Sequence, residues 1–177
     1  PAQGNRLDPW YDVYADRAHN LRASEIRALF SVVSRPEVVS LAGGMPNLKD
    51  LPLDKLAASA EKLIRNHGAQ AMQYGSGQGW EVLRERITEV MTYDGIVGAD
   101  PDDVVVTTGS QQALDLVTEL FVNPGDVILA EAPSYVGALG VFRARQADIV
   151  HVPMDEHGII PEALEETIRD VRASGRT

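Results

Sequence analysis

The second half of the sequence alternates between short apolar runs and helical patterns. Three runs rich in β-branched residues predict buried strands, at 103–107 (DVVVT), 125–131 (GDVILAE) and 147–153 (ADIVHVP). Apolar residues at helical spacing predict helices over 110–122, 134–145 and 161–171. Strands that alternate with helices form right-handed βαβ units, so we expect an α/β fold with a mostly parallel sheet and helices on both faces.

The helix over 110–122 has a stripe of apolar side chains that we expect to face inward. The stripe consists of Ala113, Leu114, Val117, Leu120 and Phe121. Such spacing is typical of a helix that packs one side against a core.

The first hundred residues are organised differently. Residues 1–20 are polar with scattered aromatic side chains and are expected to form an arm, and a helix follows that stops at Pro36. Two further helices are expected, over 54–67, where Gly68 suits the C′ position, and over 80–91. Glycine and proline mark the loops between them.

Composition and charge exclude several kinds of site. The net charge of −10 argues against a nucleic-acid surface, which would need clustered basic residues. The chain has no cysteine, so disulfides and thiolate chemistry are excluded, and its four histidines lack metal-ligand spacing. The sequence shows no signal peptide and no apolar run of the ~18 residues that a membrane helix needs. We therefore expect a cytoplasmic protein that neither binds a membrane nor holds a metal.

The segment TTGSQQALDLV (107–117) joins an expected strand to an expected helix through Gly-Ser-Gln-Gln. The first turn of a helix presents unpaired N–H groups and partial positive charge, which together bind a phosphate without a lysine. Ser110 could add its hydroxyl, and Gly109 allows close approach of the backbone. The alternative is that Ser110 serves only as the helix N-cap. A Walker loop is excluded because no Gly-Lys-Ser/Thr follows.

Two aromatic residues lie in other loops. Tyr135, in EAPSYVGAL (131–139), follows the next expected strand and so belongs to the same sheet edge, where it could stack on a flat ring or simply pack on its own helix. Tyr74, in QYGSGQG (73–79), is a hydroxyl donor in a glycine-rich loop. A dinucleotide-binding loop is rejected there because no strand precedes it.

The order and spacing of four segments form a more specific pattern. They are SLAGGMPN (40–47), QYGSGQG, TTGSQQALDLV and PGDVILAEAPSYVGAL (124–139). This series resembles the fold-type I pyridoxal-phosphate (PLP) aminotransferases, and among them the group of 2-aminoadipate and kynurenine aminotransferases. The resemblance runs from about Arg22 to the last residue. It implies the aspartate aminotransferase-like fold, with 1–40 as an arm and helix and 41–177 as the N-terminal portion of the PLP-binding large domain.

The resemblance also implies roles for individual residues. The cofactor phosphate would be bound by Ser110, Gln111 and Gln112, and Tyr135 would stack on the pyridine ring. Tyr74 would reach the phosphate of a partner subunit, which implies a homodimer. Gly44 would lie along the substrate, and Arg27 resembles a pocket arginine for an acidic substrate side chain, although an ordinary exposed helix arginine is the alternative.

The lysine that forms a Schiff base with PLP in this family has no counterpart in the sequence. Lys49, Lys55 and Lys62 all precede the phosphate turn, and none lies in a matching motif. We therefore expect no catalytic residue in this chain. The sequence ends just after a helix, where another strand would follow, so we expect it to be the N-terminal half of a longer polypeptide whose remainder completes the site.

The leading hypothesis is an aminotransferase that moves an amino group from an amino acid to a 2-oxo acid. The alternative is the PLP-binding, aminotransferase-like sensor domain of a winged-helix transcription regulator. Other PLP chemistry, such as decarboxylation or β-elimination, would use the same parts. A generic α/β phosphate-binding domain would explain the turn but not the ordered series of loops.

Overall fold

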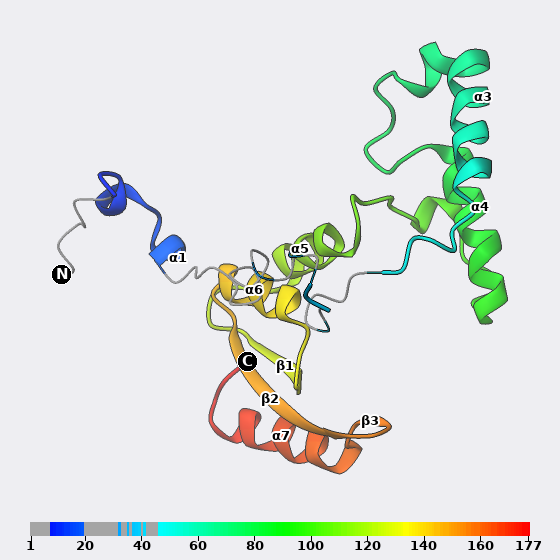
Figure 1. The fold of residues 1–177 in the computed structure, drawn as a ribbon. Coiled ribbons are helices and arrows are strands. Elements are labelled where there is room, and N and C mark those ends of the chain that lie inside the picture. Colours follow the sequence, from blue (N-terminus) through cyan, green and yellow to red (C-terminus); the bar gives the residue numbers. More distant parts are fainter. Residues whose placement is uncertain (1–7, 20–31, 33–34, 36, 40, 42–45) are drawn as a thin grey trace. The chain divides into compact units, whose positions relative to one another are not determined.

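The computed structural model describes residues 8–19, 32, 35, 37–39, 41 and 46–177. The chain separates into two compact units, one made of 1–40 with 108–177 and the other of 41–107. Figure 1 shows their helices and strands. This division does not test the boundary that we predict at residue 40, which stays a prediction.

Two parallel strands form the centre of the first unit. β1 (Val127–Ala132) pairs with β2 (Asp148–Asp155) in a register that places Leu129 opposite Val150. After a two-residue turn, β3 (Gly158–Ile159) pairs with β2 in the antiparallel direction. The strands predicted over 125–131 and 147–153 are therefore confirmed, whereas β3 is too short to give a periodic signal.

Three helices accompany these strands, and all three are predicted from the sequence. They are α5 (Ser110–Phe121), α6 (Val136–Ala144) and α7 (Pro161–Ala173). Both α6 and α7 contact β2, and Figure 1 shows them on opposite sides of the two strands. Among the described residues, the buried apolar side chains come from β1, β2, α6 and α7 and are Ala130, Val152, Val141 and Val171, respectively. The prediction of an α/β fold is confirmed.

The apolar stripe of α5 is only partly inward. Ala113 and Leu114 are half-buried, but Val117 is exposed and Leu120 and Phe121 are each 76% exposed. The inward placement that we predict for these last three residues is wrong in the described structure. Periodicity identifies a face that packing could cover, but it does not supply the covering element.

The described part of the N-terminal arm holds two short helices, η1 (Tyr11–Val13) and α1 (Asp16–His19). The Tyr14 hydroxyl donates to Asp8 Oδ1 at 3.2 Å, and this hydrogen bond raises the pKa of Tyr14. The helix expected before Pro36 lies almost wholly outside the described residues.

The second unit is helical. Its elements are α3 (Leu53–Ala71), α4 (Glu81–Met91), η2 (Thr92–Asp94) and η3 (Pro101–Asp103). The helix end predicted at Gly68 is wrong. The chain kinks at His67 (φ −136°, ψ 21°) and then continues, because the N–H of Met72 bonds the carbonyl oxygen of Gly68 at 3.0 Å and extends the helical ladder past the glycine.

The strand predicted over 103–107 is also wrong. Asp103 closes η3, and 104–107 carries no strand although Val104 is extended (φ −98°, ψ 129°). The N–H of Val106 donates to the carbonyl oxygen of Gln78, in a loop, at 2.8 Å. An apolar β-branched run favours extended backbone, but a strand exists only where a neighbouring strand provides the hydrogen-bond ladder.

Candidate functional site

The turn before α5 depends on a glycine with positive φ. Gly109 has φ 86° and ψ 169° and is the N-cap of the helix, so Ser110 is the first helical residue rather than the cap. A side chain at this φ would be strained. A Cβ built on Gly109 would meet nothing within 4 Å, which leaves the space beside the turn open.

The side chain of Gln112 fixes this turn from within the helix. Its Oε1 accepts hydrogen bonds from the backbone N–H of Thr108 at 2.6 Å and from the Thr108 hydroxyl at 2.7 Å. The first backbone bond of the turn runs from the N–H of Gln112 to the carbonyl oxygen of Gly109 at 3.2 Å. The preceding N–H groups, of Ser110 and Gln111, therefore lie at the positive end of a 12-residue helix, where an anion is stabilised.

Gln111 and Tyr135 meet across Gly137. Gln111 Nε2 donates to the carbonyl oxygen of Gly137 at 3.2 Å. A Cβ built on Gly137 would lie 2.6 Å from Cε1 and Cζ of Tyr135 and 2.7 Å from Oε1 of Gln111, so both side chains pack on the bare Cα of this glycine. Tyr135 is the N-cap of α6, at the helix start as predicted, and it remains 66% exposed. The structure thus brings an amide and an aromatic ring together at the starts of α5 and α6.

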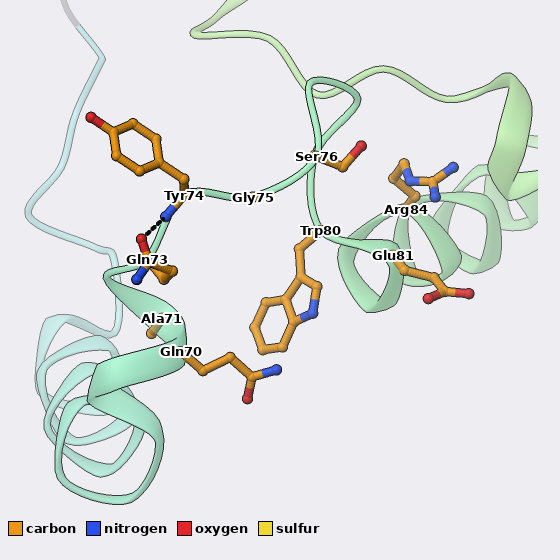
Figure 2. A pocket seen from close by; sticks show the side chains of 10 residues that line it. Gln70, Ala71, Gln73, Tyr74, Gly75, Ser76, Trp80, Glu81 and Arg84 are labelled. Atoms are coloured by element: carbon orange, nitrogen blue, oxygen red, sulfur yellow. Dashed lines mark hydrogen bonds between the residues drawn. The ribbon is translucent and has the colours of Figure 1, made fainter.

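Tyr74 belongs to the second unit and is 99% exposed. It lines an open pocket of about 410 Å³ together with Gln70, Trp80 and Arg84, among others. Figure 2 shows the ring of Tyr74 extending away from the indole of Trp80. Its predicted contact with a partner subunit stays a prediction.

The remaining residues named from the sequence lie either outside the described residues or in the second unit. Arg27 and Gly44 lie outside the described residues. The three lysines, Lys49, Lys55 and Lys62, are exposed in the second unit. Within the described ranges, no group of three or more His, Asp or Glu side chains could hold a metal ion, and no helix is long and apolar enough to span a bilayer.

Two residues of the helix pair were missed by sequence reasoning. One is Gly137, a glycine near a predicted helix start to which no sequence pattern gives a role. The other is Arg145, the C-cap of α6, whose Nη2 lies 3.0 Å from both Asp115 Oδ1 and Glu119 Oε2 of α5. The hydrogen bond to Asp115 is the main cause that raises the pKa of Arg145. Two acidic residues four positions apart on α5 suggest a cationic partner, but only the packing of α6 against α5 identifies that partner as Arg145.

Comparison with known proteins gives consistent results. The sequence profile of the family "Aminotransferase class I and II" matches residues 36–176. The chain is 36% identical to aromatic-amino-acid aminotransferase 1 of Thermococcus litoralis over 163 residues, which cover 92% of this chain and 39% of that protein. It is 37% identical to 2-aminoadipate transaminase of Thermus thermophilus, over 92% of this chain and 40% of that protein.

A solved structure agrees with these relatives. The kynurenine aminotransferase of Pyrococcus horikoshii, crystallised in complex with PMP, superposes with a TM-score of 0.86 and 33% identity, covering 98% of this chain and 43% of that one. The chain therefore spans about two fifths of the length of the proteins that it matches. Over that span, both its sequence and its fold place it in one family: the chain belongs to the class I and II aminotransferases.

Proposed function

We propose that this protein is a PLP-dependent aminotransferase that transfers an amino group from an amino acid to a 2-oxo acid. The observation that carries the proposal is the meeting of Gln111 and Tyr135 across Gly137, beside the start of α5. An anion site and a ring platform then lie at neighbouring helix starts, as a ligand with both a phosphate and a flat ring requires.

The residues of the turn fit the phosphate of PLP. The N–H groups of Ser110 and Gln111 lie at the positive end of α5, where the phosphate of a ligand would be stabilised. The Ser110 hydroxyl has no hydrogen-bond partner among the described residues and is available as a donor. The amide oxygen of Gln112 is occupied by Thr108, so we assign Gln112 to holding the turn in shape rather than to direct contact through that atom.

The residues at the start of α6 fit the ring of the cofactor. Tyr135 keeps most of its surface exposed, and the face of a tyrosine ring stacks on another aromatic ring. PLP, when bound, supplies the electron sink that stabilises negative charge at the substrate α-carbon. The work of this chain's residues is to hold the phosphate and to fix the plane of the ring, which orients the reacting groups.

No residue of this chain is assigned to proton transfer. The Schiff-base lysine that the family uses is not matched by Lys49, Lys55 or Lys62, and the chain spans about two fifths of its relatives. We therefore propose that the lysine belongs to the part of the aminotransferase that these residues do not cover. The homodimer with Tyr74 across its interface, the substrate roles of Gly44 and Arg27, and the cytoplasmic location stand as predictions within the same proposal.

The experiment uses the full-length protein loaded with PLP. We expect the absorbance band of the bound cofactor to disappear when an amino donor is added and to return when 2-oxoglutarate is added. Aromatic amino acids, 2-aminoadipate and kynurenine are the first donors to test, because related proteins carry those names. Binding of PLP without a spectral change for any amino acid would refute the aminotransferase and favour the sensor domain. Absence of PLP binding would refute both.

A further inference from the structure

We propose that Gly137 is a positioning residue, and that its missing side chain is what lets the Tyr135 ring and the Gln111 amide occupy one site. The inference deepens the proposed function and rests on it, because the two groups that Gly137 positions are those assigned to the cofactor. The sequence alone does not show which glycine of this helix, Gly137 or Gly140, has such a role.

The contacts at Gly137 come from two different elements. From the N-cap of α6, the ring of Tyr135 would lie 2.6 Å from an added Cβ, at both Cε1 and Cζ. From α5, Oε1 of Gln111 would lie 2.7 Å away, while Nε2 of the same amide bonds the Gly137 carbonyl oxygen. Real carbon atoms do not approach so closely, so a methyl group at this position would displace both side chains.

The effect of an alanine at position 137 depends on which atoms it would displace. Both contacts are with the outer parts of side chains rather than with backbone, so the ring and the amide could swing away while the helix stays in place. Glycine is also less favourable than alanine inside a helix. An alanine at 137 would therefore suit α6 itself, and its cost would fall on the placement of Tyr135 and Gln111.

Gly140 provides a matched control. It lies one turn further along α6, and a Cβ built there would meet nothing within 4 Å. The variants Gly137→Ala and Gly140→Ala add the same methyl group to the same helix, and they differ only in whether that group meets Tyr135 and Gln111.

The test measures PLP affinity of the full-length apoprotein by titration with PLP, together with its thermal unfolding. We expect Gly137→Ala to weaken PLP binding about tenfold, as the loss of one neutral hydrogen bond would, and Gly140→Ala to change it less than about twofold. Neither variant should lower the melting temperature of the apoprotein. Equal affinities for the two variants would overturn the inference, and so would a fall in melting temperature confined to Gly137→Ala, since that would indicate a purely structural role.

A second measurement separates this inference from the proposed function. In a crystal structure of the apo Gly137→Ala variant, we expect the Tyr135 ring to be displaced and the bond from Gln111 to the residue 137 carbonyl to be broken. Unchanged positions would contradict the positioning role even if the wild type binds PLP. Failure of the wild type to bind PLP, with both side chains displaced in the variant, would instead contradict the proposed function.

Discussion

The side-chain Nε2 of Gln111 donates a hydrogen bond to the backbone carbonyl oxygen of Gly137, 3.2 Å away. This bond joins the first turn of α5 to the first turn of α6. At the other end of α6, Arg145 reaches two carboxylates of α5. The two helices are thus tied by polar contacts near both ends of α6, and the candidate site lies at the end where the helices begin.

Removal of the Ser110 hydroxyl should weaken cofactor binding without destabilising the helix. Because Gly109 is the N-cap, Ser110→Ala leaves the cap in place and removes only a donor to the phosphate. A hydrogen bond to a charged group contributes about 1.5–3 kcal/mol, so PLP affinity should fall at least about tenfold. Titration of the apoprotein with PLP measures this. An unchanged affinity with a lowered melting temperature would show that the hydroxyl only supports the helix.

Arg84 and Arg86 offer a matched pair on α4. Arg84 is buried, and its Nη1 donates to the Pro101 carbonyl oxygen at 2.6 Å and to Asp102 Oδ1 at 2.9 Å. Arg84→Leu leaves those acceptors without this donor, so the free energy of unfolding should fall by about 1–3 kcal/mol. Arg86 pairs with Glu89 at an exposed position, so Arg86→Leu should change little. Urea unfolding of both variants tests this, and losses of equal size would count against the buried contact.

Two glycines of the loop before α4 should differ in their response to alanine. Gly79 has φ 103°, and a Cβ there would lie 2.6 Å from Cγ2 of Val106, whereas a Cβ on Gly77 would meet nothing within 4 Å. Positive φ costs roughly 1–2 kcal/mol for alanine and overpacking costs about 1–3 kcal/mol. Gly79→Ala should therefore destabilise the protein by at least about 2 kcal/mol, and Gly77→Ala should be close to neutral. Chemical unfolding curves distinguish the two, and a neutral Gly79→Ala would refute the contact with Val106.

Loss of the Arg145 guanidinium should loosen α5 from α6. Arg145→Met removes both ion pairs while it retains the aliphatic stem, so we expect a lower melting temperature and weaker PLP binding. Its side chain is 28% exposed, so salt screens the pairs in part and the loss should shrink as NaCl concentration rises. Arg143→Met is the control, because Arg143 is exposed and forms no ion pair with a described residue. Identical melting temperatures for the two variants would remove Arg145 from this role.

The elements that the sequence predicts well are those with a local cause. Apolar spacing predicts helices α5, α6 and α7 and strands β1 and β2. Tyr135 lies at the start of α6, as predicted, because the loop that carries it leads directly into that helix. The strand predicted over 103–107 does not form, because an apolar run favours extended backbone but does not specify a neighbouring strand with which to pair. Gly68 fails as a helix end because the ladder resumes beyond it.

The sequence by itself determined the α/β class, the helix starts that carry Ser110 and Tyr135, and the family resemblance of the ordered loops. Tertiary structure alone decided that Gln111 and Tyr135 share the surface of Gly137, and that Arg145 pairs with Asp115 and Glu119. Periodicity and helix capping act over a few residues and can be read along the chain. Contacts between residues about 25 to 30 positions apart depend on how α5 and α6 pack, and that packing is set by side-chain shape and charge in three dimensions.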